Sequence, residues 1–123
     1  MEKALPAIFA ANDLADLIEL RVDCMPHPKL ETLLQAVKKP VIVTNRWPKE
    51  GGRFEGREKD RLAILREAAA LGAPWIDVEM ASKGLALREL VPNREGTRWI
   101  LSKHDFRGTP SLVALPVALA ALR

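Results

Sequence analysis

The stretch P-V-I-V-T-N at residues 40–45 is a short apolar run that ends in polar residues, a pattern typical of a buried β-strand. The same pattern, rich in Ile, Val, Leu or Trp, occurs at residues 16–22, 75–80 and 99–102. The four runs begin about every 25–35 residues, which suits one strand and one helix in each unit. They therefore predict four strands that share one sheet.

Segments with helical spacing separate these runs. Residues 58–71 are the clearest case, because Leu62, Leu65 and Ala69 fall on one side of a helix and Gly72 follows where a helix commonly ends. Further helices are predicted at residues 3–12, 28–38, 81–90 and 111–122. Strands that alternate with helices indicate right-handed crossovers and a parallel sheet of the α/β class.

The composition is that of one compact globular domain or of part of a larger one. The chain has 123 residues and a mass of 13.6 kDa, with 48% hydrophobic and 28% charged residues. No apolar run approaches the roughly 18 residues of a membrane-spanning helix, and no secretory signal is evident. The single cysteine, Cys24, rules out an internal disulfide and fits a reducing compartment. We therefore expect a soluble, cytoplasmic protein with one domain over residues 1–123.

The formal net charge of +3 weakly favours an anionic partner. However, the 19 basic and 16 acidic residues are interspersed, and no group of aromatic residues accompanies the basic ones. Nucleic-acid binding is therefore poorly supported by the sequence.

Polar side chains gather where the predicted strands end, although strands buried on both faces should be almost entirely apolar. Side chains alternate along a strand, so three pairs share a face within their strands, and the second run ends in the polar sequence T-N-R. The first pair is Glu19 with Arg21, which Asp23 joins on the same face, and the others are Asp77 with Glu79 and Ser102 with His104. Because ligands bind at the carboxyl ends of strands in parallel α/β folds, we predict a site there. Its floor would consist of Glu19, Arg21, Arg46, Glu79 and His104.

The alternative is that these residues only stabilise the sheet through buried ion pairs, such as Glu19–Arg21 or Asp23–Arg46. The functional interpretation is more specific, because it predicts a particular chemistry for these residues. His104 could transfer protons near neutral pH, and a neighbouring Glu79 could orient it. Arginine side chains such as Arg21 and Arg46 suit a small anionic substrate with a carboxylate.

Other features of the sequence point to no further chemistry. No metal-ligand spacing is present. The run E-G-G-R-F-E-G at residues 50–56 lacks the phosphate-binding pattern, and we expect a loop that lies over the site. Cys24 has no second cysteine and is interpreted as a non-catalytic thiol.

Five segments together resemble one enzyme family, type I 3-dehydroquinate dehydratase. They are I-E-L-R-V-D at 18–23, V-I-V-T-N-R at 41–46, E-G-G at 50–52, I-D-V-E at 76–79 and S-K-H-D-F-R-G-T-P at 102–110. The segments follow the family's order and roughly its spacing. The combination of E-L-R-V-D with H-D-F-R-G-T-P is more specific than any single motif in the chain.

The resemblance implies a (β/α)8 barrel that removes water from 3-dehydroquinate to give 3-dehydroshikimate in the shikimate pathway, without a metal or nucleotide cofactor. It implies that Glu19 and Arg21 contact substrate hydroxyls and that Arg46 also binds substrate. His104 would be the proton-transferring histidine and Glu79 its supporting carboxylate. These are the same five residues that the strand pattern predicts.

The matched motifs correspond to the family's second to fifth strands, so about half of a barrel is expected here, since a whole barrel has about 250 residues. The family's imine-forming lysine lies on the sixth strand and has no counterpart in this chain. We expect the chain to be a truncated or split part of a full enzyme, one half of a pair with a complementing chain, or a homodimer. The alternative function is a non-catalytic small-carboxylate binder or partner subunit on the same scaffold.

Overall fold

The computed structural model describes residues 2–82 and 96–109. Helix α1 (Ala4–Leu14) is followed by strand β1 (Ile18–Arg21) and the short 3-10 helix η1 (Val22–Cys24). Helix α2 (Leu30–Ala36), strand β2 (Val41–Thr44) and the 3-10 helix η2 (Pro48–Glu50) come next. Helix α3 (Glu58–Ala70) and strands β3 (Trp75–Glu79) and β4 (Arg98–Ser102) complete the described part.

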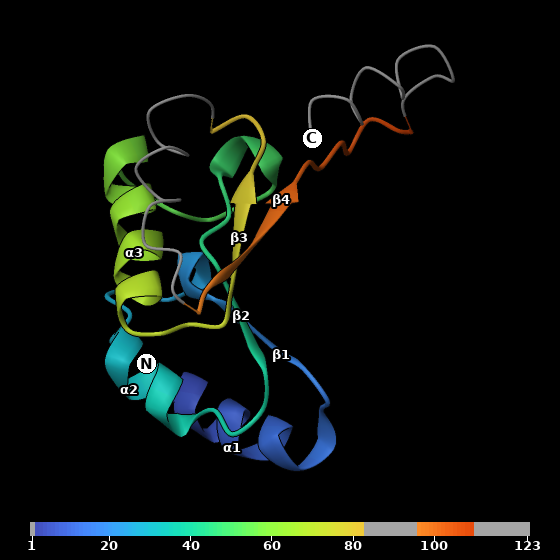
Figure 1. The fold of residues 1–123 in the computed structure, drawn as a ribbon. Coiled ribbons are helices and arrows are strands. Elements are labelled where there is room, and N and C mark those ends of the chain that lie inside the picture. Colours follow the sequence, from blue (N-terminus) through green and yellow to red (C-terminus); the bar gives the residue numbers. More distant parts are fainter. Residues whose placement is uncertain (1, 83–95, 110–123) are drawn as a thin grey trace.

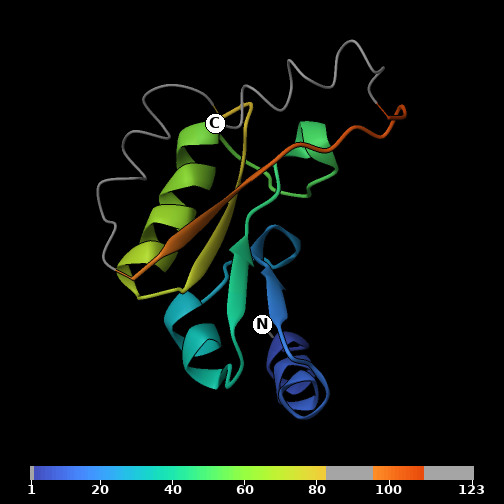
Figure 2. The same ribbon diagram turned by 45° about the vertical axis from the view of Figure 1, so that its right-hand side comes forward.

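The four strands form one parallel sheet in the order β1-β2-β3-β4. Helices α1, α2 and α3 lie against one face of this sheet, and the strands fan across the molecule with a marked twist (Figures 1 and 2). The predicted α/β class with parallel βα units is therefore confirmed. Each predicted strand agrees with an observed one to within two residues at either end.

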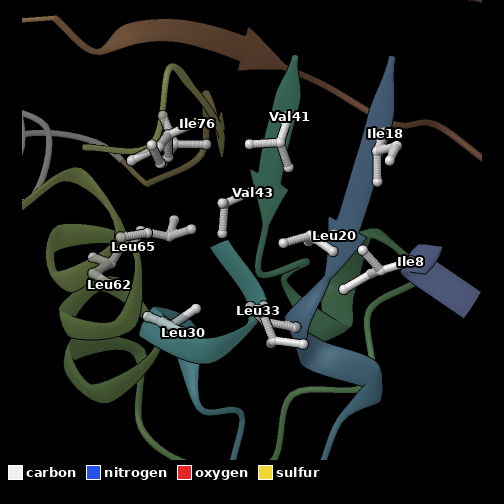
Figure 3. Close-up of a cluster of buried hydrophobic side chains, with 14 residues drawn as sticks. Ile8, Ile18, Leu20, Leu30, Leu33, Val41, Val43, Leu62, Leu65 and Ile76 are labelled. Atoms are coloured by element: carbon white, nitrogen blue, oxygen red, sulfur yellow. The ribbon is translucent and has the colours of Figure 1, made fainter. Parts of the chain in front are cut away.

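The hydrophobic core lies between the sheet and the helices because the strands alternate. Ile18 and Leu20 of β1, together with the equivalent apolar residues of β2 and β3, point toward the helices and are almost fully buried (Figure 3). Helix α3 contributes Leu62, Leu65 and Ala68 to this core. The predicted core residue Ala69 is only partly buried, because the helix turns Ala68 more directly onto the sheet.

Local signals fix the ends of the elements. Gly72 follows α3 with a φ of 84° and donates its N–H to the Ala69 carbonyl, as expected for a residue that ends a helix in the left-handed conformation. The buried Asn12 side chain donates to the Ala36 carbonyl and accepts the Lys38 N–H, so it ties α1 to the connection between α2 and β2.

Two predicted helices cannot be compared. The helix expected at 81–90 lies outside the described residues except for positions 81 and 82, which are not helical, and the helix expected at 111–122 lies outside them entirely. Among the described helices, none is long and apolar enough to cross a membrane.

Candidate active site

The polar strand ends meet at the carboxyl edge of the sheet. In-register pairing places Arg21 beside Thr44, Thr44 beside Asp77, and Glu79 beside Ser102. These residues alternate with the core residues and therefore face away from the helices, except that Glu79, the last residue of β3, also reaches Arg61 of α3 with its carboxylate. No helix of residues 2–82 or 96–109 covers this second face, which we call the inner face.

Arg46 is the centre of a buried polar cluster. Its Nη1 donates to Asp77 Oδ1 at 2.9 Å, to Glu79 Oε1 at 3.0 Å and to Ser102 Oγ at 2.8 Å. Ser102 donates in turn to Asp77 Oδ1 at 2.6 Å. The Arg46 side chain is only 7% exposed, so these contacts form in a region of low dielectric where hydrogen bonds to charged groups are strong.

Glu79 joins this cluster to helix α3. Its side chain is fully buried, with Oε1 accepting the Trp47 N–H as well as the Arg46 bond and Oε2 accepting from Arg61 Nη1 at 2.7 Å. Burial acts to lower the pKa of Arg61, but the hydrogen bond to Glu58 and the charges of Glu79 and Glu58 outweigh it and raise that pKa. Arg61 is therefore a permanent buried cation.

His104 contacts Glu50 rather than Glu79. Glu50 Oε1 accepts the backbone N–H of His104 at 2.6 Å and lies 3.2 Å from its ring Nδ1. The expected contact between His104 and Glu79 is therefore wrong. Both carboxylate oxygens of Glu79 already accept hydrogen bonds, from two arginines and a backbone N–H. Glu50 was not among the predicted site residues.

Glu50 reaches His104 because η2 lies beside the segment that follows β4 (Figures 1 and 2). One glycine permits this approach, and a second permits the loop to fold back on the backbone of Arg46. Gly51 has a φ of 84°, and a Cβ there would lie 2.7 Å from the Phe106 ring. A Cβ on Gly52 would collide with the Arg46 carbonyl. The E-G-G run thus allows close packing against the segment after β4, in agreement with the predicted loop at the site.

Glu19 and Arg21 lie on the neighbouring strand β1. Glu19 accepts a hydrogen bond from Thr44 Oγ1 at 2.7 Å. Arg21 forms a two-point ion pair with Asp23, with distances of 2.9 Å to Oδ1 and 2.8 Å to Oδ2. In the described part of the chain, neither residue is hydrogen-bonded to Arg46, Glu79 or His104. All five predicted residues thus lie at one edge, but among them Arg46 and Glu79 alone share a hydrogen bond and ion pair in the described part of the chain.

The ion pairs named as the structural alternative, Glu19–Arg21 and Asp23–Arg46, are not the ones that form. Asp23 pairs with Arg21 and also accepts backbone N–H groups of Arg53 and Arg46. Burial of the Asp23 carboxyl acts to raise its pKa, but these hydrogen bonds outweigh that cost and lower the pKa to about 2. Asp23 therefore anchors the segment after β1 to the E-G-G loop.

The lysines with described positions lie outside this cluster. Lys49 is exposed and stacks over the Trp47 ring at 5.2 Å, and Lys103 is exposed beside His104. Lys83 lies outside the described residues.

A separate cavity of about 540 Å³ is lined by Cys24, Phe54 and other residues of η1 and the following loops, but not by Arg46 or His104.

The arrangement combines the Arg46 guanidinium, which its neighbours hold in place, with the His104 imidazole, which contacts Glu50 through Nδ1. This pairing suits an anionic ligand that gains or loses a proton. The fold and the site thus define a barrel-type βα-repeat protein with a candidate acid/base site at the carboxyl ends of its strands.

The model of the type I 3-dehydroquinase family matches residues 1–120, and the chain belongs to this family. The resemblance inferred from the five motifs is therefore confirmed. The 3-dehydroquinate dehydratase of Methanothermobacter thermautotrophicus is 41% identical over 106 residues, which cover 82% of this chain and 46% of that protein. The chain spans about half the length of the curated relatives first matched, such as those of M. thermautotrophicus and Desulfotalea psychrophila.

Solved structures agree with the fold. The 3-dehydroquinate dehydratase from Aquifex aeolicus superposes with a TM-score of 0.74 at 29% identity, covering 98% of this chain and 55% of that one. The enzyme of the same name from Geobacillus kaustophilus gives a TM-score of 0.82 at 22% identity, covering 98% of this chain and 52% of that one, which shows the fold alone. The four parallel strands therefore form part of a (β/α)8 barrel, as predicted.

Proposed function

We propose that the protein containing this chain is a 3-dehydroquinate dehydratase, which converts 3-dehydroquinate to 3-dehydroshikimate and water. Membership of the family supports this activity. The observation that carries it is the contact of Glu50 with His104 at the same edge of the sheet as Arg46. A proton-transferring group and an anion-binding group are thereby held at one edge of the sheet.

His104 is proposed as the proton-transfer residue. Because Nδ1 faces the Glu50 carboxylate, which when ionised can only accept a hydrogen bond, we assign the ring proton to Nδ1 and the role of base to Nε2. In the proposed reaction Nε2 takes a proton from the carbon beside the substrate ketone. The C–H electron pair forms the new double bond as the hydroxyl on the next carbon departs, and the proton on Nε2 passes to that hydroxyl to give water.

Arg46, Glu19 and Arg21 are proposed as substrate-binding residues. Arg46 Nη1 is held by neighbours, whereas its Nε and Nη2 have no hydrogen-bond partner within residues 2–82 and 96–109, which leaves them for an anion. Glu19 is exposed on the inner face, and the Arg21 side chain is 37% exposed. Both can therefore reach hydroxyl groups of a ligand on that face.

The imine-forming lysine that the family resemblance implies has to come from beyond these four strands. We infer that the inner face is completed by the remaining strands of a barrel, of which residues 1–123 form one partial domain. Further residues of a longer protein, a complementing chain or a second copy are the possible sources. Cys24 as the single cysteine supports a cytoplasmic location.

The test is dehydration of 3-dehydroquinate, followed by the ultraviolet absorbance of the conjugated product. We expect the protein containing this chain to show turnover and His104→Ala to reduce it by at least about 100-fold, the usual size of a lost acid/base group. Trapping with borohydride and an intact-mass spectrum will show which chain carries the imine. Saturable binding without turnover or adduct would instead favour the non-catalytic carboxylate-binding protein.

A further inference from the structure

We propose that Arg61 is a positioning residue for the candidate active site, because it holds Glu79 and thereby fixes the orientation of Arg46. The inference rests on the proposed function only in assigning an anionic substrate to Arg46. The geometry that carries it is independent of any ligand.

Arg61 is fully buried, and each of its N–H groups has an acceptor. Nη1 donates to Glu79 Oε2 at 2.7 Å and to the Asn45 carbonyl at 2.6 Å. Nη2 donates to Ser82 Oγ and to Glu58 Oε1, and Nε donates to Glu58 Oε2. A guanidinium has five N–H donors, so this side chain is satisfied completely and held in one orientation.

The bonds from Arg61 converge on Arg46 by two routes. One route runs through Glu79, whose Oε2 binds Arg61 while its Oε1 binds Arg46 Nη1. The other runs through the carbonyl of Asn45, the residue directly before Arg46. Helix α3 therefore determines where the Arg46 backbone lies and how its guanidinium is turned.

Charge balance gives Arg61 a second effect. Arg46 contacts two buried carboxylates, those of Asp77 and Glu79, so these three groups alone carry a net negative charge. Such a cluster would repel an anionic ligand. Arg61 adds a positive charge beside Glu79, and its other carboxylate partner, Glu58, lies on α3 and is partly exposed. The charge of Glu79 is thereby compensated, which reduces the repulsion of an anionic ligand at Arg46.

The first experiment observes Arg46 directly. Three acceptors on Nη1 restrict rotation of that nitrogen, so we expect resolved, slowly exchanging Arg46 side-chain signals in NMR spectra of the labelled wild-type chain. In Arg61→Met these signals should broaden or collapse. Removal of one partner from a buried ion pair can also unfold a protein, so Arg61→Lys is measured in parallel. It keeps the charge but has three N–H donors on one atom, and the Arg46 signals should again lose their resolved form.

Arg57→Met is the matched control. Like Arg61 and Glu58, Arg57 and its partner Asp60 are three residues apart, but this pair is exposed, with the Arg57 side chain 70% accessible. We expect unchanged Arg46 signals in this variant. Folded Arg61→Lys with Arg46 signals identical to those of the wild type, or wild type without restricted Arg46 signals, would overturn the proposal.

A second readout separates this proposal from the proposed function. The affinity for 3-dehydroquinate should fall about tenfold in Arg61→Lys, in line with the loss of a charge-assisted contact, and stay within twofold in Arg57→Met. If the wild type does not bind the substrate, or if Arg46→Met binds it as tightly as the wild type does, the assignment of substrate to Arg46 fails. The Arg46 signals still decide whether Arg61 positions it.

Discussion

Glu50 accepts the backbone N–H of His104 at 2.6 Å and contacts the ring Nδ1 of the same residue at 3.2 Å. One carboxylate therefore fixes both the position of the chain after β4 and the orientation of the imidazole. Glu50 is nearly buried, whereas the His104 side chain is 36% exposed, so the ring remains partly accessible.

Glu50→Ala should release the segment around His104. A backbone N–H that loses a charged acceptor costs about 1–3 kcal/mol in the free energy of unfolding. We expect a loss of this size in urea unfolding and faster hydrogen exchange of the His104 amide. Glu55→Ala, at an exposed position in the same loop, is the control and should leave both unchanged. An unchanged exchange rate at His104 in Glu50→Ala would show that Glu50 does not hold this segment.

Gly51→Ala should strain the backbone and, at a small further cost, push aside the Phe106 ring, which is 76% exposed. Gly51 and Gly72 share a φ of 84°, but a Cβ at Gly72 meets nothing within 4 Å, whereas one at Gly51 lies 2.7 Å from the Phe106 ring. Both variants lose about 1 kcal/mol from the left-handed backbone conformation. The additional loss in Gly51→Ala, measured by urea unfolding, should disappear in the double variant Gly51→Ala/Phe106→Ala. Equal losses in Gly51→Ala and Gly72→Ala would contradict the packing.

Asp23 should make stability depend on pH in the acid range. Its pKa falls from an ordinary 3.8 to about 2 on folding. The stabilisation is therefore fully present above pH 4 and is lost as the pH falls through 2. The shift corresponds to about 2 kcal/mol. We expect Asp23→Asn to be less stable by this amount at pH 7 and to lack the loss between pH 4 and 2.

Urea unfolding at a series of pH values measures this effect. Asp60→Asn is the control, because Asp60 forms only an exposed pair with Arg57 and should change the pH dependence little. A curve for Asp23→Asn parallel to that of the wild type from pH 4 to 2 would exclude Asp23 as the source.

The sheet and the position of the site were predictable because both depend on regular alternation. Ile18 and Leu20 had to face the helices, so Glu19 and Arg21 had to face the other way. The same rule placed Asp77 and Glu79 together. Parallel pairing then brings the carboxyl ends of all four strands to one edge, whatever the conformation of the loops.

The hydrogen-bond partners that loop residues and neighbouring elements bring together could not be predicted in the same way. Glu50 lies in η2, which has no periodicity to indicate its direction, and only its place in the E-G-G motif marked it. Glu79 was expected beside His104 because it shares the strand end, but the buried Arg61 competes for it. Arg61 carried a usable signal, since it lies four residues before Leu65 on the apolar side of α3.

The central claim is that the edge containing Arg46, Glu50 and His104 binds 3-dehydroquinate, and titration of the nitrogen-15-labelled chain with this compound tests it most directly. The expected result is saturable shifts of the amide signals at these three residues. Binding should weaken at least about tenfold in Arg46→Met but not in Arg98→Met, whose guanidinium stacks on Trp75 at the opposite end of the sheet. No saturable shift, or shifts confined to the cavity around Cys24 and Phe54, would contradict the claim.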